Sequence, residues 1–147
     1  MMMEVDDNED GLLLDTDDVS RVSAACYAAA GDHEAALQRG DSYLCAFAES
    51  FGASQGRDRE LIGFSQYVVS PESISVVRLC VLPQYRRQGV GSWLMRKIIG
   101  RCRQKLLLVR HPAGNGSRLF LDTFDFRLCG SAMLDGQPVM VRMVEVL

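Results

Sequence analysis

The sequence lacks the features that would support a zinc site or a membrane span. Only two histidines, His33 and His111, occur in the 147 residues, and neither has other ligands at the spacing typical of zinc sites. No apolar run approaches the ~20 residues needed to cross a bilayer, and the N-terminus is acidic where a secretory signal would be basic. These absences argue against a zinc enzyme and a membrane protein, and we expect a cytoplasmic location.

The cysteines give no sign of a disulfide scaffold. Their number is odd, five, and no two of them form a Cys-x-x-Cys pair. Each lies in an apolar stretch, as is typical of small core residues in a reducing compartment. These residues are Cys26, Cys45, Cys80, Cys102 and Cys129.

Charge is divided along the chain, although the net charge is only -3. Residues 1–72 hold fifteen acidic and four basic residues, residues 73–147 hold four acidic and twelve basic ones, and none from Ser73 to Leu121 is a carboxylate. This division suits an enzyme that binds an anionic cofactor and a cationic acceptor, with complementary packing surfaces as the alternative. Nucleic-acid binding is disfavoured, because the basic segment lacks interleaved aromatic residues and the whole chain is acidic.

Residues 74–104 predict a strand, a tight loop and a helix in immediate succession. The apolar, β-branched run from Ile74 to Leu82 predicts a strand, which Pro83 ends because proline has no N–H for a ladder. From Ser92 to about Gln104, apolar residues recur at three- and four-residue steps, which predicts a helix with one buried face. These apolar residues are Leu94, Met95, Ile98, Ile99 and Cys102.

The loop between strand and helix has the composition of a phosphate site, Arg86-x-x-Gly89-x-Gly91. Glycines let a ligand approach the backbone, and the first amides of a helix lack intrahelical partners at the positive end of its dipole. A Walker A loop would need a lysine after the second glycine, where Ser92 stands. A dinucleotide fingerprint would need a third small residue where Leu94 stands. Both alternatives are therefore excluded.

This segment resembles the coenzyme A motif of the Gcn5-related N-acetyltransferases, the GNAT family. The family pattern is a strand of the type Leu-x-Val-x-Pro-x-Tyr followed by Arg/Gln-x-x-Gly-x-Gly/Ala. Here Leu79-x-Val81-x-Pro83-x-Tyr85 precedes the arginine and glycine loop. The resemblance is sharp over residues 74–104 and only topological elsewhere.

The resemblance implies that acetyl-CoA is the cofactor and indicates which residues bind it. In the family, the strand carries a β-bulge and splays from its neighbour, so that main-chain groups at Leu79 and Val81 bind the pantetheine arm. The backbone amide of Leu79 is also expected to polarise the thioester carbonyl, and loop amides to hold the pyrophosphate. The cofactor-binding residues are expected to be Leu79, Cys80, Val81, Arg86, Arg87, Gln88, Gly89, Val90, Gly91, Ser92 and Asn115.

The resemblance does not supply a general base, which acetyl transfer needs because an amine with a pKa near ~10.4 is protonated at neutral pH. Histone-modifying members carry a glutamate four residues before the position of Leu79, where Ser75 stands. Members that modify ribosomal proteins carry one where Leu108 stands. The substitutes that remain open are Glu72, Glu49 and His111.

The expected proton donor is missing too. Many members have a tyrosine five residues before the phenylalanine that opens the next strand, and counting back from Phe126 gives Leu121. The alternatives are Tyr43, Tyr67, Tyr85 or water.

We expect an α/β protein with the GNAT fold, in which about four helices surround a mixed, mostly antiparallel sheet of about six or seven strands. An acidic, flexible tail over residues 1–10 precedes one domain over residues 11–147. Strands are expected at 11–14, 42–50, 61–70, 74–82, 105–110, 126–134 and 139–146. Helices are expected at 15–30, 33–39, 92–104 and 119–124.

The function indicated is an acetyl-CoA-dependent N-acetyltransferase that uses direct attack by the acceptor amine. The acceptor is expected to be cationic, either a small molecule or a protein. Cys80 is not expected to carry the acyl group, because its strand position indicates burial. The alternative is a catalytically impaired module that keeps the coenzyme A site as a sensor or interaction surface. A homodimer is left open, and no membrane partner is expected.

Overall fold

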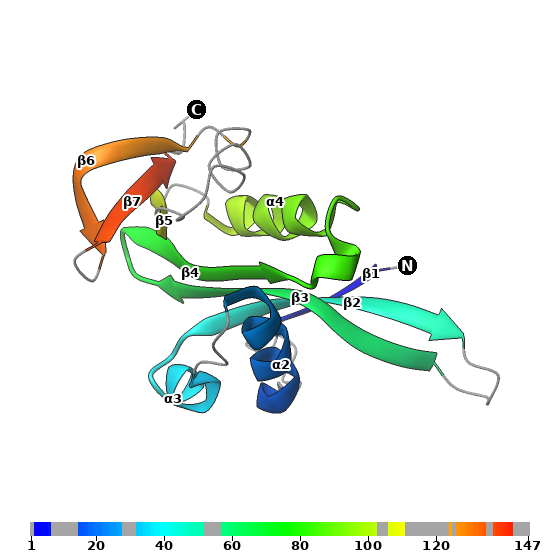
Figure 1. Cartoon of the computed structure of the whole chain (residues 1–147). Helices are drawn as coiled ribbons and strands as arrows, with labels where there is room; N and C mark the ends of the chain where they lie inside the picture. The colour runs from blue at the N-terminus through cyan, green and yellow to red at the C-terminus, as the bar shows by residue number, and fades with distance from the viewer. Residues whose placement is uncertain are drawn as a thin grey trace.

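The computed structural model describes residues 2–6, 15–27, 32–51, 57–102, 106–110, 124, 126–134 and 137–142. Within these ranges, one seven-stranded sheet runs in the order β1-β2-β3-β4-β5-β7-β6 (Figure 1). Neighbouring strands are antiparallel except for β4 and β5, which are parallel. The strands are β1 Met2–Asp6, β2 Ser42–Phe51, β3 Arg57–Val69, β4 Ser73–Val81, β5 Leu106–Arg110, β6 Arg127–Leu134 and β7 Gln137–Arg142. The expected α/β class with a mixed sheet is confirmed.

Helices cover both faces of the sheet. In Figure 1, α2 (Thr16–Tyr27) and α3 (His33–Gln38) lie below it, and α4 (Val90–Cys102) lies above it. The carboxylate of Asp15 accepts hydrogen bonds from the amides of Asp17 and Asp18 at 3.0 and 3.3 Å, which caps α2. Asp32 caps α3 in the same way.

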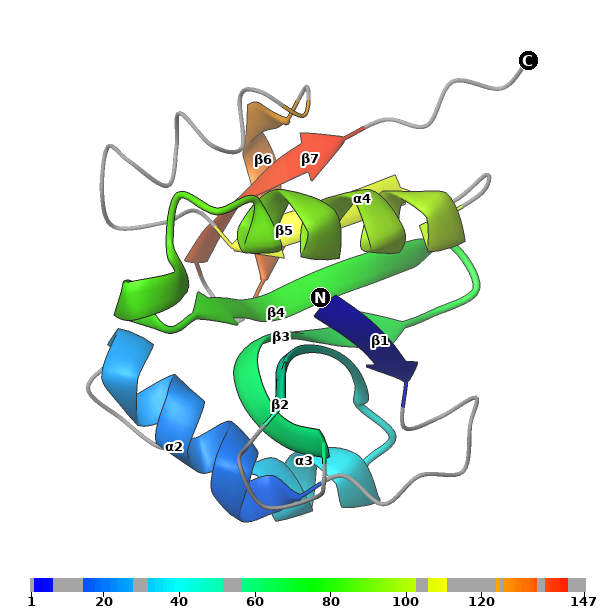
Figure 2. The same ribbon diagram turned by 90° about the vertical axis from the view of Figure 1, so that its right-hand side faces the viewer.

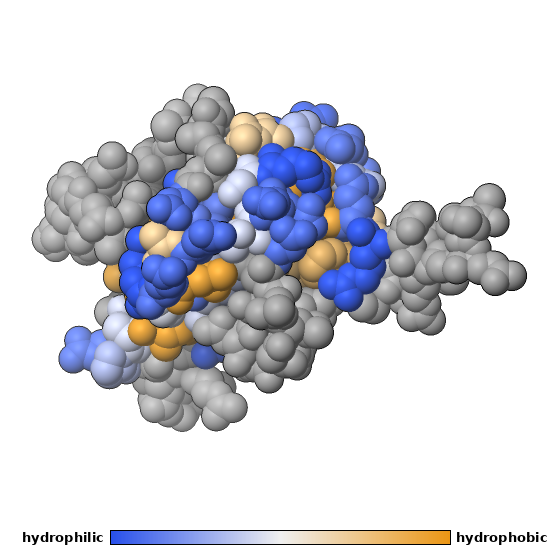
Figure 3. Space-filling model, turned by 90° about the horizontal axis from the view of Figure 1, so that it is seen from below, coloured by the Kyte–Doolittle hydropathy of each residue, from blue (hydrophilic) through white to orange (hydrophobic). Residues whose placement is uncertain are grey.

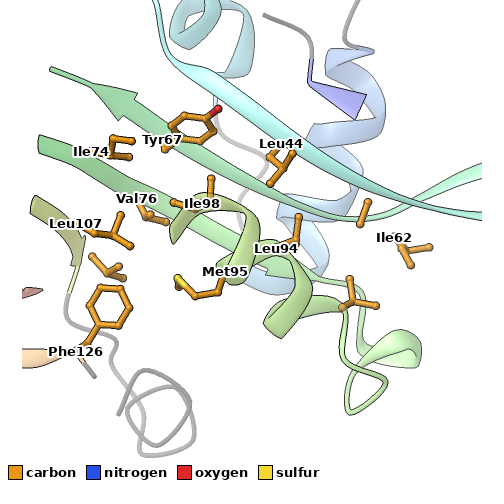
Figure 4. Packing of buried hydrophobic residues seen from close by; sticks show 13 residues of the cluster. Leu44, Ile62, Tyr67, Ile74, Val76, Leu94, Met95, Ile98, Leu107 and Phe126 are labelled. Atoms are coloured by element: carbon orange, nitrogen blue, oxygen red, sulfur yellow. The ribbon is translucent and has the colours of Figure 1, made fainter. Parts of the chain in front are cut away.

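The core is divided into two clusters, one on each face. Under α4, the buried residues Leu94, Met95 and Ile98 pack on strand residues such as Ile62 and Val76 (Figure 4). The three- and four-residue spacing predicted this buried face of the helix. On the other face, α2 and α3 pack on a second cluster around Phe64. Seen from below, the described residues on that side are mostly hydrophilic, with smaller hydrophobic patches (Figure 3).

The ends of the sheet differ from the prediction in two places. The expected flexible tail is wrong for Met2–Asp6, which forms β1 and pairs antiparallel with β2. β3 begins at Arg57, although residues 52–60 were expected to be a loop, because its polar start pairs with the end of β2. In both cases the neighbouring strand supplies backbone hydrogen-bond partners that do not depend on side-chain polarity. Figure 2 shows β1 at the edge of the sheet.

Some expected elements fall on residues that the structure does not describe. These are the strand at 11–14 and, except for Phe124, the helix at 119–124. No helix in the described ranges is both long enough and apolar enough to cross a membrane.

Candidate functional site

The end of β4 extends beyond its pairing with β5. The parallel register runs from Ser73↔Leu106 to Val76↔Val109, whereas pairing with β3 continues to Val81. Just after the part of β4 that pairs with β5, the register of β4 with β3 shifts by one residue, so that Val77 forms a β-bulge. The last part of β4, residues 77–81, therefore has β3 on one side and lies beyond its register with β5 on the other.

The chain then turns sharply through the arginine and glycine loop. The 3-10 turn η1 (Pro83–Tyr85) follows β4, and Arg87 and Gly89 adopt positive φ angles of 64° and 84°. Glycine accepts this conformation without cost, whereas a side chain there is strained. Arg86, Arg87 and Gln88 are exposed. The loop thus presents two guanidinium groups at its surface.

Helix α4 begins immediately after this loop. The amide of Trp93 donates to the carbonyl of Gly89 at 2.9 Å, which is the first hydrogen bond of the helix. The amides of Val90, Gly91 and Ser92 precede that bond, so the helix itself supplies no acceptor for them. With the positive end of the helix dipole and the exposed arginines, this turn is suited to bind an anion such as a pyrophosphate.

Gly63, which the sequence analysis missed, lets β3 approach the base of this site closely. A Cβ atom at Gly63 would lie 2.7 Å from the carbonyl oxygen of Cys80 and 3.4 Å from Cγ1 of Val90. Only glycine fits without displacing β4 or the start of α4. A glycine inside a strand is a known sign of close backbone approach and was the available signal.

The carbonyl oxygen of Val81 is a meeting point for two side chains from other segments. Nε of Arg86 donates to it at 3.1 Å, and Sγ of Cys26, near the end of α2, donates to it at 3.3 Å. Cys26 was expected only as a core residue. No sequence signal could have placed it here, because 55 residues separate it from Val81.

The structure brings together the two positions at which a family glutamate was sought. Ser75 and Leu108 are direct partners in the parallel register of β4 and β5. Neither side chain can take up a proton from an ammonium group. The two family base positions therefore lie side by side on neighbouring strands, and this chain supplies a base at neither of them.

The substitute bases are not gathered at the end of β4. Glu72 is exposed in the turn before β4, and Leu79 lies seven positions further along, roughly 20 Å away in extended chain. Glu49 is paired with Arg59 in the β2–β3 hairpin, and its side chain is outside the described part. His111 and Asn115 also lie outside the described residues.

Of the three tyrosines expected as donors, Tyr85 is the one next to the loop. Its hydroxyl donates to Oε2 of Glu60 at 3.0 Å, and this hydrogen bond raises the pKa of Tyr85. Tyr43 is buried and lies 2.6 Å from Nδ1 of His33, and burial raises its pKa. Tyr67 accepts from Nη1 of Arg101 at 2.8 Å on the α4 side. Glu60 is an acidic neighbour of the loop that the sequence analysis missed.

Comparison with known proteins indicates one family and one fold. The model of the acetyltransferase (GNAT) family matches residues 16–126. The structure is similar to the ribosomal-protein-S18-alanine N-acetyltransferase from Escherichia coli, with a TM-score of 0.70, 15% identity and coverage of 100% of this chain and 96% of that one. It is similar to Arabidopsis thaliana NAA60 in complex with a bisubstrate analogue, with a TM-score of 0.69, 15% identity and coverage of 99% and 100%.

A third similar structure is the PaiA N-acetyltransferase from Thermoplasma acidophilum in complex with coenzyme A. Its TM-score is 0.60 and its identity 15%, with coverage of 98% of this chain and 99% of that one. Among curated protein sequences, no significant match was found. At these identities the solved structures indicate the fold, while the family model indicates the family.

Proposed function

The chain belongs to the GNAT acetyltransferase family, and we propose that it is an acetyl-CoA-dependent N-acetyltransferase acting by direct attack of an acceptor amine. The family consists of acyltransferases that use acetyl-CoA. The observation that carries the proposal is the continuous unit of bulged strand, positive-φ loop and helix start from Val77 to Ser92. Each part of that unit has a separate role toward a coenzyme A molecule.

The residues present fit coenzyme A. Acetyl-CoA supplies the thioester carbonyl carbon that the amine attacks. The main chain of Leu79, Cys80 and Val81, beyond the β5 register, is assigned to the pantetheine arm by hydrogen bonding as in a sheet. The amides from Arg86 to Ser92 and the two exposed guanidinium groups are assigned to the pyrophosphate. Asn115 remains part of the proposed cofactor site.

The acceptor must lose a proton in a site with no carboxylate at either family position. An α-amine has a pKa near ~7.7 to 8.0, whereas a lysine amine has a pKa near ~10.4, so the α-amine needs far less help from a base. The lack of a carboxylate at Ser75 and Leu108 therefore favours an acceptor amine of low pKa, such as a peptide N-terminus. Glu72, Glu49 and His111 remain the proposed bases, and the Tyr85–Glu60 pair is added as a proton carrier near the loop.

A second candidate function is a coenzyme A-binding module without turnover. The same pair of residues, Ser75 and Leu108, favours it, because a site without a base can retain its ligand and lose its reaction. In this case the acidic first half would serve a binding partner instead of an acceptor. A cytoplasmic location and a cationic acceptor remain expectations of the enzymatic proposal, and an oligomeric form stays open.

The test is a calorimetric titration of the purified chain with coenzyme A, followed by an acetylation assay. We expect wild-type binding, and at least about hundredfold weaker binding for Gly89→Asp, because an aspartate adds strain and negative charge at the anion loop. Gly100→Asp is the matched control, since Gly100 lies in open space on α4. Absence of coenzyme A binding to the folded wild type would overturn the proposal.

The assay uses a peptide with a free N-terminus, the same peptide with an N-terminal block and a lysine, and a small polyamine. Acetylation of the free N-terminus above the other acceptors supports the enzymatic reading with an amine of low pKa. Coenzyme A binding without turnover on any acceptor favours the binding module.

A further inference from the structure

Two cysteines from distant segments meet beside the proposed cofactor strand. Cys26, in the last turn of α2, is half-buried, and Cys80 in β4 is 1% exposed. Neither is in a disulfide, and Cys26 packs against the buried cluster that contains Cys80. Sγ of Cys26 lies 3.3 Å from the carbonyl oxygen of Val81, the residue that follows Cys80. Cys80 lies between Leu79 and Val81, whose main chain is assigned to the cofactor.

The surroundings of Cys26 favour its thiolate form. The groups that face its sulfur are the Cys80 thiol and the Val81 backbone on β4, and the guanidinium of Arg86. The hydrogen bond from Cys80, followed by the charge and hydrogen bond of Arg86, lowers the pKa of Cys26 to about 6, although partial burial opposes this. A partly exposed thiolate beside a cation is the usual environment of a reactive cysteine.

We propose that Cys26 is a site of reversible oxidation by peroxides, with Cys80 as the resolving thiol. The Cys26 thiolate attacks one peroxide oxygen, the O–O bond breaks, and a sulfenic acid forms while hydroxide leaves and takes up a proton. The Cys80 sulfur then attacks the Cys26 sulfur, the S–O bond breaks, and water leaves with the Cys80 proton. Two thiols are oxidised to one disulfide, and hydrogen peroxide is reduced to two waters.

The disulfide would act on the cofactor site, and this consequence rests on the proposed function. Oxidation replaces the Cys26 thiolate by a neutral disulfide, which removes the negative charge that faces Arg86. It also ties α2 to β4 at the residue between Leu79 and Val81. We expect the oxidised protein to bind coenzyme A at least about tenfold more weakly than the reduced protein.

The covalent step is tested by mass spectrometry after treatment of the native chain with hydrogen peroxide. We expect the loss of two hydrogens per chain, reversed by dithiothreitol, and a tryptic cross-link between residues 22–39 and residues 79–86. Cys26→Ser abolishes this link, whereas Cys45→Ser retains it. Cys45 is the matched control, since it is as buried as Cys80 and lies in the same cluster. If Cys80→Ala does not fold, the half-buried Cys26→Ser variant still decides the result.

A cross-link between other cysteines, or a Cys26 that oxidises no faster than Cys45, would overturn the proposal. Calorimetry on the reduced and oxidised forms tests the consequence. Weaker binding after oxidation, restored by dithiothreitol, supports it, and equal binding contradicts it. A reduced protein that binds no coenzyme A contradicts the proposed function, while the mass-spectrometric result continues to decide the thiol pair.

Discussion

The two faces of the sheet are built differently. Under α4 the packing is mostly apolar and includes Leu94, Met95 and Ile98 (Figure 4). On the α2 and α3 side, hydrogen-bonded polar side chains lie within and beside the apolar cluster, as the pairs His33–Tyr43 and Ser23–Arg78 show. The first face provides a rigid base for the loop and helix start, whereas the second carries groups that can titrate or react.

The two faces of β4 therefore have different surroundings. Its alternate side chains belong to different layers, with Leu79 and Val81 packed toward the α4 cluster and Cys80 within the α2 and α3 cluster. The same strand therefore contacts both the mostly apolar cluster under α4 and the cluster that contains the thiols and lies beside the hydrogen-bonded polar side chains. Four measurements compare what individual side chains on the two faces contribute to the free energy of unfolding and to thiol reactivity.

The largest effect is expected at Asp41, beside α3. Its carboxylate is almost fully buried and accepts from Arg39 at 2.9 and 3.1 Å and from Gln66 at 2.8 Å. Asp41→Asn should lower the free energy of unfolding by about 3 kcal/mol, at the low end for a buried pair because Arg39 is largely exposed. Urea denaturation measures this. The control Asp17→Asn, at an exposed position, should change stability little, and equal effects would contradict a polar network that contributes to stability.

A smaller effect is expected at Gly63, where the two faces meet through β3 and β4. Gly63→Ala places a Cβ against the Cys80 carbonyl and should destabilise the protein by about 2 kcal/mol, while weakening coenzyme A binding. Gly100→Ala, in open space on a helix, should instead stabilise by about 0.5 to 1 kcal/mol. Thermal and urea unfolding compare the two variants. Equal stability of both would show that β3 does not need glycine at this point.

Tyrosine hydroxyls allow a direct comparison of the faces. Tyr43→Phe removes the buried 2.6 Å hydrogen bond to His33 and should cost about 1.5 kcal/mol. Tyr67→Phe, on the α4 side, should cost no more than about 0.5 kcal/mol, because its partner Arg101 is partly exposed and can bind water instead. Denaturation curves of both variants give the comparison. A larger cost for Tyr67→Phe would reverse the proposed contrast between the faces.

The subtlest effect is the pH dependence of Cys26. Its pKa is lowered to about 6, so alkylation by iodoacetamide should be near its maximum at pH 7 and fall tenfold per pH unit well below 6. Peptide mapping measures the rate at Cys26 against Cys45. Arg86→Gln should move the midpoint upward, since it removes the cation that favours the thiolate. A native midpoint equal to that in urea, near ~8.5, would contradict a perturbed thiol.

The elements that depend on local pattern were predicted well. The strand through residues 74–82, the turn at Pro83 and the buried face of the following helix all agree with β4, η1 and α4. β1 was missed because its partner β2 lies far along the chain, and the start of β3 was missed because its residues are polar, although it pairs with the adjacent end of β2 in a hairpin. Strand pairing can order polar segments that local composition would leave as loops.

The candidate site divides in the same way. The arginine and glycine loop was found because Arg86, Gly89 and Gly91 lie close together in the sequence, and glycine suits the positive φ angle at position 89. The sequence did not show that Ser75 and Leu108 are neighbours, since this depends on the register of a parallel strand pair. Cys26 was overlooked because its partner Val81 lies far along the chain, whereas Gly63 could have been found from its place inside an expected strand.

The sequence by itself determined the unit of strand end, glycine loop and helix start, because neighbouring residues encode all three. Only the tertiary structure decided what surrounds that unit. The bulge at Val77, the register of β5 and the packing of α2 set which side chains reach Val81. A shift of one residue in the pairing of β4 with β3 would turn Cys80 to the other face, so its place beside α2 depends on the assembled sheet.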